Sequence, residues 1–281
     1  LSHADISSNN LGEHKRTTLN LFADYKFKLL KDKLVLSPGI AVSYFSDMSF
    51  HSFPGLDIGL DLNTSLKLYS NIGKTYRIPT YTDLYYSDRT TIGNENLEPE
   101  SAISTELGIK FNNMNWNLTA AVFQRNSKNL IDYVKENEND LWKANNIGEL
   151  KTSGVEMDIR YNFETKRNSS NSNFINISYT RINDNNYVKN VNFSRYSINS
   201  LKDQFISKLN INYLKNINHS VTYKYGERSD KNNFSVLDSK IMYKKLFYLY
   251  VNNILDEVYS ETNLVPMPGT NFLVGFTIGI N

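Results

Sequence analysis

Hydrophobic and polar residues alternate strictly over long parts of this chain, while the three-to-four-residue spacing of amphipathic helices is nearly absent. In residues 101–111, Ile103 and Leu107 fall on one face of the expected strand, and Glu106 and Lys110 fall on the other. The same alternation recurs in residues 154–163, 205–213 and 272–280. The pattern predicts an all-β protein made of antiparallel strands.

The expected strands are long, at about 10 to 14 residues each, whereas strands of soluble proteins usually have about 5 or 6. A tilted strand that crosses a bilayer needs about 9 to 11 residues. The length therefore favours strands that span a membrane. We expect about thirteen strands, beginning near Lys15, Leu34, Gly55, Ser65, Ser101, Asn115, Trp142, Asn173, Lys202, His219, Phe234, Phe247 and Thr270.

Short and long connections alternate between these strands, which is typical of outer-membrane barrels with tight turns at one rim and long loops at the other. Residues 1–13 are polar and are expected to be the tail of another long loop. The short connections are expected near residues 30–32, 63–64, 112–113, 165–172, 215–216 and 244–245, and the long ones near 47–54, 76–100, 128–141, 183–200, 227–233 and 253–269.

Aromatic residues stand where the expected strands meet the turns, at the height of the aromatic girdles of membrane barrels. A soluble sandwich also alternates, with its apolar face inward, so a large soluble β-protein remains the alternative. The girdle residues are Trp116, Tyr161, Tyr213, Tyr243 and Phe247.

Composition narrows the functional classes. The net charge of +2 argues against nucleic acid as a partner, and the absence of cysteine excludes thiol chemistry. The mean hydropathy of −0.47 fits a barrel wall, in which only every second residue faces lipid. Residues 1–5 lack a basic start and an apolar stretch, so we expect either a cytoplasmic protein or a fragment or processed product.

Two segments resemble the barrel domain of TonB-dependent outer-membrane receptors. The first runs from Tyr76 to Glu100 and the second from Val251 to Phe272. Two such segments in the expected order are more specific than either alone. The motif positions are Arg77, Pro79, Leu84, Tyr85, Gly93, Asn94, Leu97, Pro99 and Glu100, followed by Asn252, Asn253, Asp256, Tyr259, Pro268 and Gly269.

The resemblance implies that residues 1–281 are the C-terminal portion of a 22-stranded antiparallel transmembrane β-barrel in the outer membrane, with no second domain. It implies partners as well: an N-terminal plug and first strands of the same receptor, the TonB complex acting through that plug, the lipid bilayer, and a small-molecule ligand with a surface lipoprotein. Residues 11–16, 53–55 and 78–99 are most similar to cobalamin receptors of Bacteroidota type. Cobalamin is therefore the first expected ligand, and a siderophore or haem the next.

Most motif residues have a structural interpretation. Arg77 suits an anionic ligand, but fixed hydrogen bonds inside the wall or to the plug are the favoured interpretation. Gly93 and Asn94 suit a left-handed turn. The short polar side chains Asn253 and Asp256 are expected to bond backbone groups where the strand leaves for the loop.

Ligand contacts are expected in the long loops, where aromatic residues supply contact area and arginines supply charge. No enzymatic activity is expected, because charged residues of both signs recur along the polar faces without a catalytic arrangement, and no cofactor or metal pattern is present. A passive porin or adhesin barrel, or a soluble carbohydrate-binding β-protein, stays as an alternative function. The expected ligand-binding residues are Tyr81, Tyr85, Tyr86, Arg89, Tyr133, Trp142, Tyr187, Arg195 and Tyr196.

Overall fold

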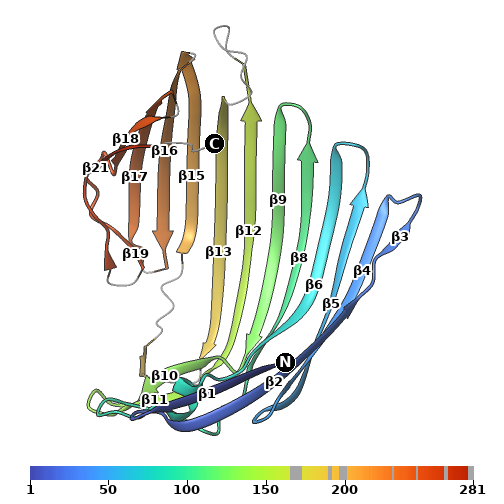
Figure 1. The fold of residues 1–281 in the computed structure, drawn as a ribbon, viewed down its shortest axis with the longest axis vertical. Helices are drawn as coiled ribbons and strands as arrows, with labels where there is room; N and C mark the ends of the chain where they lie inside the picture. Colours follow the sequence, from blue (N-terminus) through green and yellow to red (C-terminus); the bar gives the residue numbers. More distant parts are fainter. Residues whose placement is uncertain are drawn as a thin grey trace.

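The computed structural model describes residues 1–164, 173–188, 192–195, 201–214, 216–229, 231–244, 246–262 and 265–277. Its main feature is a 15-stranded sheet in which successive long strands pair antiparallel (Figure 1). The order is β1-β2-β4-β5-β6-β8-β9-β12-β13-β15-β16-β17-β18-β21, with β3 off the path beside β4. Their bounds are β1 (Ser2–Ser8), β2 (Gly12–Asp24), β3 (Phe27–Leu29), β4 (Leu34–Phe45), β5 (Ser49–Asp61), β6 (Leu66–Arg77), β8 (Glu100–Asn112), β9 (Trp116–Lys128), β12 (Gly148–Asn162), β13 (Phe174–Val188), β15 (Leu201–Leu214), β16 (Ile217–Arg228), β17 (Asn233–Tyr243), β18 (Phe247–Asn252) and β21 (Asn271–Phe276).

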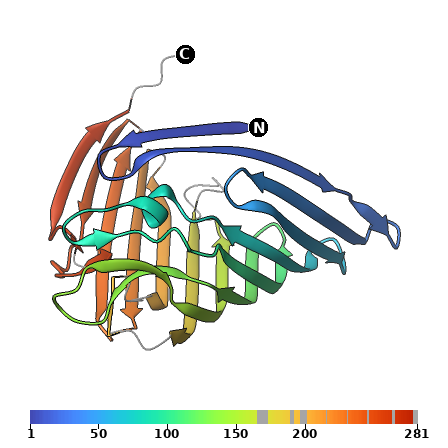
Figure 2. The same cartoon turned by 90° about the horizontal axis from the view of Figure 1, so that it is seen from below.

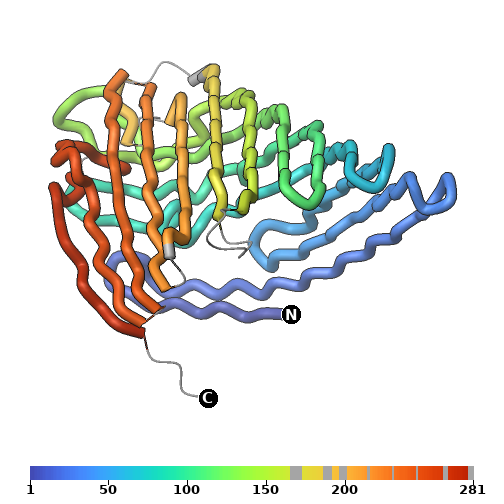
Figure 3. The backbone as a smooth tube through the Cα atoms, turned by 90° about the horizontal axis from the view of Figure 1, so that it is seen from above, coloured from blue at the N-terminus to red at the C-terminus, as the bar shows by residue number. Residues whose placement is uncertain are grey.

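Seen from either end, the sheet curls into an open trough rather than a flat layer (Figures 2 and 3). Strands at both ends of the path bend toward one another, and the connecting loops at one rim lie within the curve. This is the wall of an antiparallel barrel, so the predicted fold class is confirmed.

The register assigns opposite chemistry to the two faces of the wall. Leu107 lies opposite Ser70 and Val122, whereas Glu106 lies opposite Asn71 and Phe123. The side chain of Leu107 is 57% exposed, as expected for an apolar residue on the outer face. The inner face carries Glu106 together with Asn71, Arg125 and Glu156, which line one hollow of the wall. The predicted division into an apolar and a polar face is therefore confirmed.

Aromatic side chains cluster on the outer face beside the short turns. The Trp116 and Tyr161 ring centroids lie 4.5 Å apart, and Tyr161 also stacks on Phe163. Farther along the sheet, Tyr243 and Phe247 face each other across the β17–β18 turn. This arrangement agrees with the predicted girdle.

The strand count and several connections differ from the prediction. Residues 1–13 form β1 and its turn into β2 instead of a loop tail, which raises the number of wall strands to fourteen when β3 is left out of the fifteen. The expected long loop at residues 47–54 is a tight turn, because β5 already begins at Ser49. The long loop expected at residues 227–233 is also a short connection, which joins Arg228 at the end of β16 to Asn233 at the start of β17. The expected turn at residues 165–172 lies outside the described residues.

The strand expected to start near Trp142 was misplaced. Trp142 begins a short strand within a loop, and the wall strand β12 starts at Gly148. The β-strand propensity and the hydrophobic alternation of residues 142–146 resemble those of residues 148–162. Only the long-range pairing of β12 with β9 distinguishes the wall strand from the loop strand.

Candidate functional site

Two long loops fold together into one unit at the rim of the wall, here called the loop cap: residues 78–99 and 129–147, with residues 192–195 of a third loop. A four-stranded sheet in the order β14-β10-β11-β7 joins them. Because β7 pairs parallel to β11, with Thr91 opposite Trp142, the first loop is held to the second. The elements are α1 (Tyr81–Tyr85), β7 (Thr91–Ile92), β10 (Ile131–Lys135), β11 (Trp142–Asn146) and β14 (Phe193–Ser194).

The first loop begins with the short helix α1, which is fixed by its cap. Thr80 accepts a hydrogen bond from the Asp83 amide, and the Asp83 carboxylate accepts one from the Thr80 amide. This reciprocal pair satisfies two of the free amides at a helix start. No helix in the part of the chain that the structure describes is long and apolar enough to cross a membrane.

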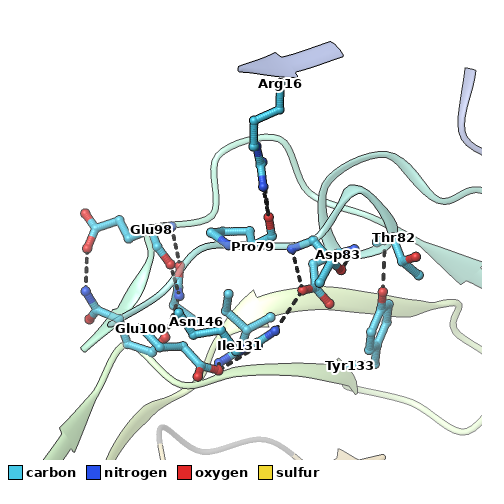
Figure 4. Close-up of polar contacts among 12 residues, drawn as sticks. Arg16, Pro79, Thr82, Asp83, Glu98, Glu100, Ile131, Tyr133 and Asn146 are labelled. Carbon is cyan, nitrogen blue, oxygen red and sulfur yellow. Dashed lines mark hydrogen bonds and ion pairs between the residues drawn. The ribbon is translucent and has the colours of Figure 1, made fainter. Parts of the chain in front are cut away.

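Arg77, the last residue of β6, anchors this loop to the wall. Its guanidinium lies 3.1 Å from the Asp83 carboxylate and 2.7 Å from that of Glu100. Glu100 in turn accepts a hydrogen bond from the Ile131 amide at 2.8 Å (Figure 4). Arg77 therefore makes fixed hydrogen bonds to protein groups, the arrangement that the favoured interpretation requires.

Gly93 and Asn94 have a different role from the predicted left-handed turn, because neither residue adopts a positive φ. A Cβ atom at Gly93 would lie 2.6 Å from the Leu84 carbonyl oxygen, so close backbone approach requires glycine. The Asn94 side chain donates to Asn145 of the second loop at 3.2 Å. The prediction of a left-handed turn was wrong. A glycine in the sequence indicates a position that needs glycine, but it does not distinguish a positive φ from a close backbone contact.

The loop cap has a dry core of its own. Leu84 and Leu97 from the first loop pack with Ile131, Tyr133 and Ala144 from the second. Tyr133 is only 5% exposed, and its hydroxyl donates to the Thr82 carbonyl oxygen at 3.1 Å. Tyr133 is thus part of the core of the cap, where it is not open to a ligand.

The loop cap also contacts the inner face of β2. The Arg16 guanidinium pairs with Asp47, donates to the Pro79 carbonyl oxygen and lies 5.0 Å from the Tyr81 ring centroid. The His14 ring stacks on Tyr85 with centroids 3.5 Å apart. Burial raises the pKa of Tyr81 and of Tyr85 above the ordinary value. Both tyrosines therefore bind the cap to the wall.

A cationic and aromatic cluster lies at the junction with the third loop. Trp142 is flanked by the Lys135 ammonium at 4.9 Å and the Arg195 guanidinium at 5.6 Å. Lys135 also lies 5.4 Å from the Phe193 ring centroid. Sequence analysis selected Trp142 and Arg195 but missed Lys135 and Phe193, whose partnership depends on pairing of β10 with β14.

The other expected ligand residues are spread out. The Tyr86 hydroxyl donates to Asp88 at 3.0 Å, and Arg89 is exposed. The backbone of Tyr187 pairs with Glu149 in the wall, away from the cap sheet. Tyr196 lies outside the described residues. Of the described residues in this group, Tyr86 is connected to the Trp142 cluster, because Asp88 also accepts from the Thr91 amide and Thr91 pairs with Trp142.

The second motif forms a separate buried network at the end of β18. Asn253 is 2% exposed; its amide donates to Asp238, and its side chain donates to the Glu257 and Pro268 carbonyl oxygens. Asp256 accepts from the Thr270 amide at 2.9 Å. The network closes the base of the last loop. Nearby contacts are Asn252 with Asn271 at 2.8 Å, Tyr259 with Phe234 at 4.7 Å between centroids, and Gly269, where a Cβ would lie 2.6 Å from Asp256.

Within the described residues, no group of three or more histidine, aspartate or glutamate side chains could hold a metal ion. The described residues form interlocked loops on a barrel wall, with apolar residues outside and charged residues inside. That combination is typical of a transmembrane β-barrel.

The chain belongs to the family of TonB-dependent receptor-like β-barrels, whose model matches residues 3–254. The predicted resemblance is thereby confirmed. The family consists of outer-membrane transport receptors rather than enzymes.

The chain matches only part of the length of its curated relatives. The chain is 25% identical over 108 residues to the vitamin B12 transporter BtuB of Vibrio vulnificus strain YJ016, covering 38% of this chain and 17% of that protein. It is 24% identical over 166 residues to the ferrienterobactin receptor of Escherichia coli strain K12, covering 50% and 22%. The chain therefore matches about a fifth of the curated relatives' length.

Solved structures show the same fold. The siderophore receptor PirA from Pseudomonas aeruginosa superposes with a TM-score of 0.73 at 16% identity, over 95% of this chain and 47% of that one. The copper transporter OprC gives 0.74 at 15% identity, over 94% and 48%. This chain spans about half the length of these receptors.

Proposed function

We propose that this chain is the C-terminal part of an outer-membrane receptor that takes up a large, scarce organic ligand with energy from TonB. The observation that carries the proposal is the loop cap, in which the first and second loops share one core and a parallel β-pair. A preformed surface captures a ligand at lower entropic cost than separate mobile loops.

The proposed capture surface is the edge of the cap formed by the half-buried Trp142 and Lys135 and the exposed Arg195. An indole between two cations offers stacking area and positive charge to a bulky ligand that bears anionic or amide groups. Cobalamin is the first ligand to test, and a ferric siderophore or haem the next; the related BtuB transporters and the ferrienterobactin receptor favour these two classes.

Transport also requires parts beyond residues 1–281. We propose an N-terminal plug and further strands of the same receptor, which TonB contacts through the plug, and a surface lipoprotein that assists capture. In that arrangement the inner face of the wall holds the plug through its charged side chains.

Uptake measurements test the proposal. Cells that depend on the complete receptor should accumulate labelled cobalamin or ferric siderophore only while TonB is functional. Trp142→Ala with Arg195→Gln should weaken ligand binding to the cells about tenfold or more, because stacking and charge are both lost. Accumulation that is independent of TonB would instead support a passive porin or adhesin barrel, and a protein soluble without detergent would support the carbohydrate-binding alternative.

A further inference from the structure

Aromatic rings lie directly on glycines at several places on the inner face of the wall. Gly108 is two residues from Glu106 and shares its face. A Cβ atom at Gly108 would overlap the ring of Tyr69, the residue directly opposite on β6, at less than 3.0 Å. Only glycine leaves room for the ring there. The Lys110 ammonium lies over the same ring, 4.8 Å from its centroid, so the ring is held between a cation and the backbone of β8.

Three further strand pairs show the same arrangement, here called a ring–glycine pair. In each of them the ring lies directly opposite the glycine across the ladder, and a Cβ atom on the glycine would come within 3.0 Å of a ring atom. Of the four strand pairs, β6–β8 and β9–β12 are connected by the two loops of the cap, and β18–β21 by the last loop. The further pairs are Phe123 on Gly154, Phe234 on Gly226 and Tyr248 on Gly275.

The two sides of Tyr69 show where such a pair is needed. On β5, Gly59 also lies directly opposite Tyr69, but the atoms nearest to a Cβ there belong to Lys67 and not to the ring. A tight turn at residues 62–65, closed by its own hydrogen bonds, joins β5 to β6. Such a turn fixes the register of its hairpin. The loop of residues 78–99 gives β6 and β8 no such constraint, and the ring lies on that side.

A shifted register removes the space that the ring needs. Side chains alternate between the two faces, so a shift that keeps the apolar face outward moves the pairing by two residues. Tyr69 would then lie opposite Glu106 or Lys110, whose side chains fill the place of the ring. Only the native register therefore lets the ring lie on the wall. At the other three pairs, the residues two positions from the glycine also carry side chains: Thr152 and Glu156, Lys224 and Arg228, and Leu273 and Thr277.

We propose that Tyr69 on Gly108 sets the register of β6 and β8 and thereby positions the ion pair that anchors the loop cap. Arg77 and Glu100 lie on the same ladder, each eight residues from the ring–glycine pair. A shift by two residues would move Arg77 about 7 Å along the strands from its partner. The pairs on β9–β12 and β18–β21 have the same role at the bases of the other two long loops. The inference concerns the wall and is independent of which ligand the receptor binds.

Disulfide trapping in the complete receptor tests the proposal, because residues 1–281 contain no cysteine. Thr75→Cys with Ala102→Cys reports the native register, since these residues lie directly opposite each other, within reach of a disulfide. Thr75→Cys with Ser104→Cys reports a shift by two residues, and Gly73→Cys with Ala102→Cys reports the opposite shift. In the native register both of these diagonal pairs are about 7 Å or more apart and should not form a disulfide.

Two variants remove the ring–glycine contact in different ways. Gly108→Ala displaces the ring, and Tyr69→Ser removes it without adding a clash. In both backgrounds the shifted disulfides should increase about threefold or more relative to the native disulfide, as expected for the loss of one cross-strand aromatic contact. Tyr69→Phe keeps the ring and should behave as the wild type. Gly55→Ala is the matched control, since its Cβ would meet its nearest atom at 3.6 Å.

The decisive variant is Tyr69→Ser, which gives a result even where Gly108→Ala does not fold. Shifted disulfides no more frequent in Tyr69→Ser than in the wild type would overturn the proposal, as expected if the ring only fills space. An equal increase in Tyr69→Phe or in Gly55→Ala would overturn it too, because any substitution would then loosen the wall. Uptake by the wild-type receptor decides the proposed function separately.

Discussion

Arg77 and Glu100 face each other on the last rung of the β6–β8 ladder, and their side chains form an ion pair of 2.7 Å. The same two residues reach into the loops, Arg77 to Asp83 and Glu100 to the Ile131 amide. One rung of the wall therefore holds both loops of the cap, and the contacts lie where the first motif begins and ends.

Replacing Arg77 should loosen the cap without unfolding the wall. We expect Arg77→Gln to speed hydrogen exchange of the amides in α1 and β10 about fivefold, an effect kept small because the guanidinium is 44% exposed. Exchange followed by mass spectrometry measures it. Arg89→Gln, in an exposed part of the same loop, is the control. Unchanged exchange in Arg77→Gln would show that the core alone holds the cap.

Gly93 offers a matched pair of substitutions. Gly93→Ala places a methyl group 2.6 Å from the Leu84 carbonyl oxygen, whereas a Cβ at Gly73 meets nothing within 4 Å. Limited proteolysis should therefore cut residues 84–97 several-fold faster in Gly93→Ala than in the wild type, and Gly73→Ala should behave as the wild type. Equal cleavage of all three proteins would refute the close-approach explanation.

The Asn253 network should contribute to the stability of the whole barrel. Asn253→Ala removes three side-chain hydrogen bonds from a residue that is 2% exposed and has a φ of 49°. We expect a loss of about 2–4 kcal/mol, seen as a lower temperature for the gel shift between folded and unfolded barrel. Asn96→Ala, on an exposed turn, is the control. A shift no larger than that of the control would contradict the structural role.

The partly buried Tyr85 phenol should make the stability of the cap fall at alkaline pH. Burial raises its pKa above the ordinary value of 10.0, so folding favours the protonated form. This contribution is fully present below pH 10 and is lost as pH rises through the raised pKa. The ultraviolet difference titration between the wild type and Tyr85→Phe should have its midpoint above pH 10. A midpoint at or below 10.0 would contradict the packing of Tyr85 on His14.

Sequence predicts those parts of the fold that depend on local period. Alternation around Leu107 and Glu106 identified the wall strands and their faces, because the bilayer requires apolar groups outside. The strand β1 was missed since Ser2–Ser8 has only Ala4 and Ile6 as apolar residues on one face, and so short an alternation is a weak signal. The length of the connection before Ser49 was overestimated, because residues 49–53 carry aromatic and polar side chains on both faces and show no clear alternation.

Less of the candidate site than of the fold could be predicted from the sequence. Arg77 was expected to have a structural role, but its partners Asp83 and Glu100 come together only when α1 folds back over the wall. Tyr133 was expected to face a ligand, yet it fills the core of the cap. The contact of Tyr133 with Thr82 joins residues that are 51 positions apart, and local patterns cannot encode it.

The central claim is that Leu107 faces lipid while Glu106 faces the interior of the barrel. Because the chain contains no cysteine, single cysteines at these two adjacent positions can carry a bimane label. In bilayers with brominated acyl chains, fluorescence from Leu107→Cys should be strongly quenched and fluorescence from Glu106→Cys should not. Quenching at position 106 with none at position 107 would contradict the account.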